Sequence, residues 1–377
     1  MLPVDLAADV KTARHSRARG RWALAFHVSV VALAGVVAIL PFPSTAIEAV
    51  YSVSWYPRVQ HVLTPLSNGV PFALFDVLVV AALGLVVFVL VRGWRRARRE
   101  RRVGPVVLAV WHIVVAAATL YLVFLTTWGF NYRRVPMQQR LLVDPGAPDG
   151  QRVVRLGLDA VAQMNALHRD AHATGWRQDP WTNDALRAGF AVTQRVLSDA
   201  PPAVPGRLKR TMFGPYFRWT GVDGMVDPFA LEVLANPDLL PWERPFVTAH
   251  EWAHLAGFAD ESEANFLGWL TCLHADVAAQ YSAWLYIYWE VASEVSGADR
   301  GRLAAALDGG PRQDVTAIVE RLQRGQLPTL RTVSWLAYDQ YLKANRVEEG
   351  IRSYGLVVTL ILQAKFEDGW TPVPRVR

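Results

Sequence analysis

Two histidines and a glutamate in the run HEWAH, residues 250–254, have the types and spacing that can bind and use a metal ion. Histidines four positions apart lie on one face of a helix, so His250 and His254 can offer imidazole nitrogens to a single Zn²⁺. Glu251 would then stand beside the open coordination position, where a carboxylate can accept a proton. This H-E-x-x-H arrangement is typical of zinc hydrolases, and it predicts a helix through these residues.

A third protein ligand is expected downstream, because two histidines leave the metal one ligand short. Gly257 can turn the chain so that Asp260, Glu261 or Glu263 comes back to the metal. Asp260 fits the metzincin spacing, but all five methionines precede residue 250, so the methionine turn of those proteins is missing. Glu261 fits the gluzincin spacing, with Asn265 one helical turn later to hydrogen-bond a ligand histidine, whereas a leucine follows Glu263 at that distance. We rank Glu261 first, Glu263 second and Asp260 third.

Three runs of the chain carry a resemblance to a known family. They are HEWAHLAGFADESEANFLGWLTC from residue 250, WGFNYRR at residues 128–134 and YLKANRVEEGIRSYGLVV at residues 341–358. Together they resemble the bacterial membrane family DUF3810, over most of the chain. The resemblance implies a zinc-peptidase-like site without implying a substrate. It also draws attention to Tyr354 and Arg352, either of which could stabilise an oxyanion or contact substrate, or else make a structural hydrogen bond.

The composition is that of a membrane protein with a large part in water. Hydrophobic residues make up 52% and charged residues 19%, which is rare in a wholly soluble protein. Three segments reach the roughly 20 apolar residues that a bilayer requires, at residues 22–41, 72–91 and 105–130. The first could instead be a signal peptide with a cleavage site at residues 44–46, but its apolar run is long for one.

Basic residues predict the orientation of these segments. Twelve lysines and arginines lie before the first segment, at residues 11–21, and between the second and third, at residues 92–102. Both stretches are therefore expected in the cytoplasm, with everything after residue 130 outside it, in a multi-pass protein of the inner or cytoplasmic membrane. The stretch 92–102 and the pI of 9.6 could suggest nucleic-acid binding. Flanked by two spans, the basic run is better explained as a topology signal that meets the lipid bilayer, and no nucleic-acid partner is expected.

The predicted fold is a mainly α membrane protein, with three N-terminal transmembrane helices followed by an α+β extracytoplasmic zincin-like domain. The membrane region covers residues 1–130 and the outer domain residues 131–377. Residues 42–71, between the first two spans, are expected to lie as a loop on the outer membrane surface. Helical spacing predicts helices over 151–170 and 182–198. Residues 231–235 are the best candidate for a strand that pairs with an extended substrate, with a structural hairpin as the alternative.

Three further polar residues and the cysteine have simpler explanations. His168 and His172 are four apart but have no adjacent glutamate and no following carboxylate, so we interpret them as surface residues. Glu290, in an aromatic run, is expected to pair with an arginine. Cys272 is the only cysteine, which excludes a disulfide within the chain, and its place on an apolar helix side predicts burial.

These observations lead to a membrane-anchored zinc-dependent metallohydrolase, best matched to a peptidase. His250, His254 and Glu261 would hold Zn²⁺, and Glu251 would act as general base. The alternative is a non-catalytic, metal-stabilised structural or regulatory membrane protein. A hydrolase acting on an ester or amide of the lipid or cell envelope uses the same residues, so the sequence does not separate a peptide substrate from an envelope substrate.

Overall fold

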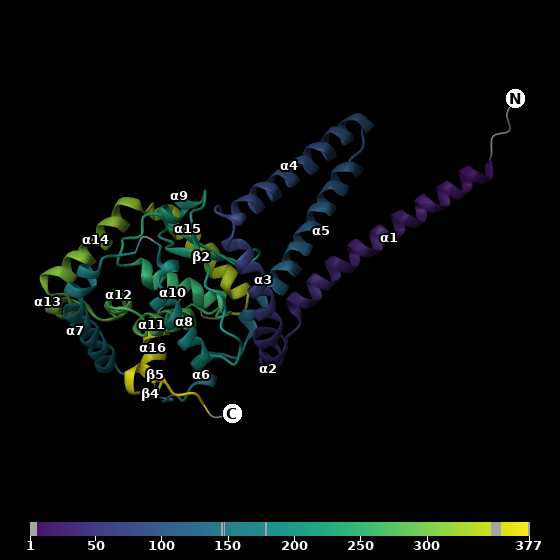
Figure 1. Ribbon diagram of the computed structural model, residues 1–377. Coiled ribbons are helices and arrows are strands. Elements are labelled where there is room, and N and C mark those ends of the chain that lie inside the picture. Colours follow the sequence, from purple (N-terminus) through teal and green to yellow (C-terminus); the bar gives the residue numbers. More distant parts are fainter. Residues whose placement is uncertain (1–5, 145, 147, 178, 348–355, 376–377) are drawn as a thin grey trace. The chain divides into compact units, whose positions relative to one another are not determined.

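The structure is a computed structural model that describes residues 6–144, 146, 148–177, 179–347 and 356–375, with side chains described from residue 21 onward (Figure 1). Its internal contacts divide it into two compact units. One contains the described residues up to Phe42 and Leu78–Thr126. The other contains Pro43–Val77 and the described residues from Thr127 onward.

The first unit is built from three long helices: α1 (Leu6–Ile39), α4 (Leu74–Glu100) and α5 (Gly104–Thr127). Arg21–Ile39, Leu74–Glu100 and Gly104–Thr127 are long and apolar enough to cross a membrane, and almost none of their side chains is buried. Apolar side chains exposed over such lengths are stable in lipid rather than in water. The prediction of three N-terminal helices able to span a membrane is confirmed.

The second unit is mainly helical. Its helices before the sheet are α2 (Ser44–Ile47), the π-helix η1 (Glu48–Trp55), α3 (Tyr56–Asn68), the 3₁₀-helix η2 (Gly129–Arg133), α6 (Met137–Arg140), α7 (Gly150–Thr174), η3 (Pro180–Thr182) and α8 (Asp184–Leu197). Those that follow are α9 (Gly214–Thr220), α10 (Arg244–Leu255), α11 (Glu261–Leu273), α12 (Val277–Glu294), α13 (Gly297–Ala306), α14 (Gly309–Gly325), α15 (Pro328–Ala344), α16 (Leu356–Gln363) and η5 (Asp368–Trp370). The helices expected at 151–170 and 182–198 are confirmed by α7 and α8.

Residues 42–71 are not a loop. Most of this segment forms α2, η1 and α3 and groups with the C-terminal unit, which differs from the boundary placed at residue 130. The aromatic residues Tyr51 and Tyr56 are buried, and the Tyr56 hydroxyl donates a 2.8 Å hydrogen bond to the carbonyl oxygen of Leu255. Membrane-interface chemistry and tertiary packing use the same amphipathic side chains, so the sequence did not distinguish them.

Three short strands form the main sheet, in the order β1 (Leu208–Lys209), β3 (Glu232–Ala235), β2 (Gly224–Asp227). β3 runs parallel to β1 and antiparallel to β2. The segment expected to pair with substrate, residues 231–235, therefore has a neighbour on both sides, and this expectation is wrong. The outer strands are β1 and β2. A second pair, β4 (Phe366–Glu367) and β5 (Thr371–Pro372), lies near the C-terminus.

The helices α10 and α11 are joined by a short turn that sets their relative direction. α10 ends at Leu255, and Gly257 follows with φ +82°, a conformation that side-chain-bearing residues rarely adopt. Asp260 then caps α11, its carboxylate accepting from the backbone nitrogens of Ser262 and Glu263. The turn predicted at Gly257 is confirmed, and it brings the first turn of α11 beside the last two turns of α10.

Candidate metal centre

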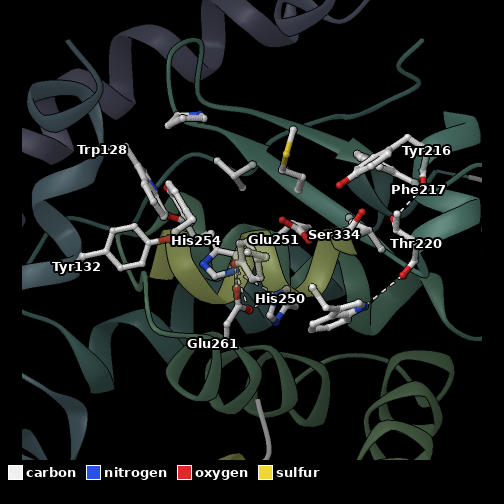
Figure 2. A pocket seen from close by; sticks show the side chains of 18 residues that line it. Trp128, Tyr132, Tyr216, Phe217, Thr220, His250, Glu251, His254, Glu261 and Ser334 are labelled. Atoms are coloured by element: carbon white, nitrogen blue, oxygen red, sulfur yellow. Dashed lines mark hydrogen bonds and ion pairs between the residues drawn. The ribbon is translucent and has the colours of Figure 1, made fainter. Parts of the chain in front are cut away.

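Three ligand-type atoms from α10 and α11 converge in a nearly regular triangle. The Nε2 atoms of His250 and His254 are 3.1 Å apart, and the Glu261 Oε2 atom lies 3.4 Å from each. His250 and His254 share one face because they are four apart on α10, and Glu261 is the first residue of α11. Figure 2 shows the three side chains together with Glu251 at the base of a cavity.

The triangle has the dimensions of one face of a zinc tetrahedron. Ligand bonds of about 2.0–2.1 Å give ligand–ligand distances of about 3.3–3.4 Å. The buried Glu261 Oε2 atom also has no hydrogen-bond partner among the described residues. The donor set therefore fits a tetrahedral cation whose fourth position faces the cavity.

Electrostatic coupling within the triangle is strong. Burial by itself would raise the pKa of Glu261, but His254 and His250 outweigh it and hold that pKa well below its usual range. Burial would lower the pKa of His254, but Glu261 and Glu251 raise it to about 9. A metal ion bound here would displace the proton from His254, so metal and proton compete for the site.

Each of two ligands is oriented by a hydrogen bond from outside the triangle. The Tyr338 hydroxyl donates a 2.6 Å hydrogen bond to Glu261 Oε1, which leaves Oε2 directed at the histidines. His254 Nδ1 lies 2.8 Å from the carbonyl oxygen of Phe258, so Nδ1 carries the proton and Nε2 is the free ligand atom. Tyr338 comes from α15, and nothing in the sequence predicted that it would orient Glu261.

The other two candidate carboxylates point away from the histidines. Asp260 is engaged as the N-cap of α11. Glu263 accepts a 2.6 Å hydrogen bond from the Met137 backbone nitrogen and lies 3.8 Å from Arg140, and burial raises its pKa to about 7. The structure thus brings Glu261 alone of the three to the histidine pair.

Asn265 does not make the hydrogen bond to a histidine of the triangle that the sequence predicted. Its Nδ2 atom and the Nδ1 atom of His250 are both buried and both without a hydrogen-bond partner among the described residues. Each borders the same cavity wall. The residues Tyr354 and Arg352, considered for oxyanion or substrate contacts, lie outside the described residues.

Glu251 lies beside the triangle in a buried, closely packed position. It is 3% exposed, and its Oε2 atom has no hydrogen-bond partner in the described chain. Burial raises its pKa to about 6, although His250 and His254 act to lower it. Gly224 of β2 leaves the room that this carboxylate occupies, since a Cβ atom there would be 2.5 Å from Glu251 Oε1. A sequence reading finds no signal for this contact between strand and helix.

The run at residues 128–134 braces the turn between the two helices. The Trp128 indole nitrogen donates to the His254 carbonyl oxygen at 3.0 Å. Arg134 donates to the Gly257 carbonyl oxygen at 2.7 Å and forms a buried ion pair with Glu48, also at 2.7 Å. Arg134 thus gives the Gly257 carbonyl oxygen a partner, and Trp128 adds a second partner to the His254 carbonyl oxygen, which also accepts from the Gly257 backbone nitrogen.

Two cavities meet at the triangle. The first, here called the apolar cavity, encloses about 330 Å³ and is lined by His250, His254, Glu261 and β2. Trp128 and Tyr132 lie on one side of it, and Tyr216, Phe217 and Thr220 lie on the other (Figure 2). The second, here called the polar cavity, encloses about 560 Å³. It contains His250 and Glu251 as well, and extends over α12 and α14. Both volumes are typical of small-molecule and peptide side-chain sites.

The pair His168 and His172 also meets a carboxylate, which corrects their interpretation as surface residues. Asp314 of α14 is buried, and its Oδ2 atom lies 2.9 Å from His172 Nε2 and 3.5 Å from His168 Nε2. The same oxygen accepts a 2.6 Å hydrogen bond from Tyr281. Unlike the Oε2 atom of Glu261, the Oδ2 atom of Asp314 already has hydrogen-bond partners at normal distances, so the cluster links α7, α12 and α14.

Comparison with known proteins agrees with the resemblance seen in the sequence. The family described as "Protein of unknown function (DUF3810)" matches residues 51–362, from within η1 at one end to nearly the end of α16 at the other. No curated protein and no solved structure matches this chain. The matched region contains the triangle, Glu251, Tyr338 and both cavities. Because the match covers most of the chain, the chain belongs to the DUF3810 family.

Proposed function

We propose that this protein is a membrane-anchored, zinc-dependent metallohydrolase that cleaves peptides. The observation that carries the proposal is the triangle of His250 Nε2, His254 Nε2 and Glu261 Oε2, whose edges of 3.1–3.4 Å suit a tetrahedral cation with one open position. A purely structural site would have no use for the unpartnered carboxylate of Glu251 beside that position.

The roles of the residues follow from their places. A Zn²⁺ bound by His250, His254 and Glu261 would polarise a scissile carbonyl and make a water molecule acidic. Glu251 would accept the proton of the attacking water and pass it to the leaving amine, and the burial that raises its pKa keeps that proton transfer near neutrality. Gly224 leaves space for Glu251 to do so.

The substrate would lie along β2. This strand is one of the two outer strands of the sheet, and its residues Gly224, Met225 and Val226 form part of the apolar cavity wall beside the triangle. An extended peptide adds naturally to a free strand edge through its backbone hydrogen bonds, and the apolar cavity can take one of its side chains. A lipid or cell-envelope amide offers less extended backbone to this edge, which is why a peptide is favoured.

Glu251→Gln tests the function. In the purified full-length protein, this change should leave zinc content near one per chain and abolish hydrolysis of a peptide library, because the amide keeps the size of the side chain but accepts no proton. Glu320→Gln, an exposed carboxylate on α14, is the control and should hydrolyse as wild type does. Zinc bound without turnover in wild type would favour the structural or regulatory alternative. Activity on envelope material but not on peptides would move the substrate to that class.

The orientation belongs to the same proposal. Because the basic residues flank the first two spans, we place the N-terminus and residues 92–102 in the cytoplasm and the candidate site outside it. Reporter fusions after Arg102 and after Arg140 should report opposite sides of the membrane. The same side for both would contradict the arrangement with three spans.

A further inference from the structure

Glu290 is a mostly buried carboxylate that has no basic partner in the part of the chain that the structure describes. It lies on α12 and borders the polar cavity. The sequence predicted that an arginine would pair with it, and this is wrong: among the described residues, no lysine, arginine or histidine lies within 4.0 Å of its oxygens. A buried carboxylate is expensive to leave without a counter-charge, so its position requires an explanation.

Four carboxylates and two arginines line the polar cavity. Arg321 lies 3.1 Å from Asp223 and 2.7 Å from Glu243, so two of the carboxylates share this one guanidinium. The exposed Arg331 donates a hydrogen bond to the neutral amide of Gln326. The carboxylates thus outnumber the arginines, and Glu290 is part of the excess.

The remaining wall of the polar cavity also suits a cation. Phe246 and Tyr286 stack with ring centroids 3.7 Å apart, and Trp289 lies next to Glu290 in the same lining. Aromatic faces attract ammonium and guanidinium groups, because the ring quadrupole places negative charge on each face. Asn265, 2% exposed, borders the cavity with an Nδ2 donor that has no hydrogen-bond partner among the described residues; it could bind a carbonyl oxygen of the substrate backbone, not the cation itself.

We propose that the polar cavity is a subsite for a positively charged group of the substrate, an ammonium or a guanidinium, and that Glu290 is its counter-ion. The inference rests on the proposed function, because it is the contact of this cavity with His250 and Glu251 that makes it a substrate subsite. The apolar cavity on the other side of the triangle would take an uncharged side chain. The chemistry is shared by a free peptide N-terminus and by a lysine or arginine side chain.

Burial of Glu290 supports this assignment. Burial raises its pKa to about 7, although the Tyr286 hydroxyl acts to lower it. The ionised form is thus costly in the empty cavity, and a bound cation would offset that cost. The neighbouring Glu294 on the same helix also has a pKa raised to about 7 by burial, but it is not part of the cavity wall. Glu294 therefore serves as a matched control.

Binding of defined peptides to the zinc-loaded, full-length Glu251→Gln protein tests the proposal without turnover. The probes are fluorescent alanine hexapeptides with one phenylalanine, in which lysine or norleucine is placed at each position in turn, with the N-terminus free or acetylated. The best cationic peptide should bind about tenfold or more tightly than its neutral counterpart. Loss of the preference on acetylation identifies the N-terminal ammonium as the recognised group, and loss on lysine→norleucine identifies a side chain.

The added change Glu290→Gln should reduce the preference to within about twofold, while Glu294→Gln should retain it. Glu290→Asp keeps the charge and should retain at least half of the preference for the cationic peptide. This variant provides the test if the glutamine variant does not fold. A preference that survives Glu290→Gln overturns the proposal, and so does zinc-loaded protein that binds cationic and neutral peptides equally or binds none. Wild-type protein that shows the charge preference but no hydrolysis would overturn the proposed function and leave the subsite standing.

Discussion

The hydroxyl of Tyr338 gives the sharpest test of the metal centre. It donates a 2.6 Å hydrogen bond to Glu261 Oε1, while the other oxygen of the same carboxylate faces the two histidines. Tyr338→Phe removes this single hydroxyl and keeps the ring that stacks on Tyr341, with centroids 5.9 Å apart. The Glu261 carboxylate should then rotate more freely, and zinc binding should be weaker because the metal has to fix the orientation of this carboxylate.

The size of the effect follows from the bond that is lost. A hydrogen bond to a charged group contributes about 1.5–3 kcal/mol, which corresponds to about 10–100-fold in affinity. Outer partners of metal ligands have effects of the same order. Tyr338 is half-buried, so water can replace part of the bond, and we expect the lower end, about tenfold weaker zinc binding.

The measurement is a competition titration of zinc between the purified full-length protein and a chromophoric chelator at constant pH. Tyr216→Phe is the control, because Tyr216 borders the same cavity but has no described bond to a ligand residue. Wild-type zinc affinity in Tyr338→Phe would refute the idea that this hydroxyl orients Glu261. Equal weakening in Tyr216→Phe would show that the effect comes from the cavity wall in general.

Two further changes test the surroundings of the site. Gly224→Ala places a methyl group 2.5 Å from the Oε1 atom of Glu251, so we expect peptide hydrolysis to fall at least about tenfold with zinc content nearly unchanged. The control is Gly297→Ala, where a Cβ meets nothing within 4 Å; it should change neither the hydrolysis nor the zinc content. Lys209→Met leaves the buried carboxylate of Glu232 without its 2.7 Å partner and should lower the free energy of unfolding by about 3–5 kcal/mol. Adding Glu232→Gln should recover part of that loss in chemical denaturation, and no recovery would mean that the ion pair is not the cause.

The sequence by itself determined the features that depend on neighbours along the chain. The spacing of His250 and His254 places both on one helix face, because the period of the helix is a local property. Gly257 and Asp260 specify a left-handed turn and a helix cap, and these put Glu261 within reach of the histidines. The three apolar segments were equally readable, since their length and composition alone decide whether they can cross a bilayer.

The tertiary structure decided the partners that come from distant parts of the chain. Tyr338 reaches Glu261 across 77 positions, and Asp314 reaches His172 across 142. Nothing local in the sequence marks either contact, because it is produced by the packing of one helix against another. For the same reason, Glu290 was expected to find an arginine, and only the packed structure shows that Arg321, in the wall of the same cavity, is held by two other carboxylates.

The strand beside the site illustrates the same division. A β-strand pattern can be recognised from the residues of one segment, and the segment 231–235 was recognised in that way. Which strand lies at an edge depends on the order in which all three assemble; here β3 is central, β1 and β2 lie at the edges, and β2 is the edge strand that borders the candidate site. Residue types determine what each segment can become, whereas the long-range contacts made on folding determine which of its faces remains free for a ligand.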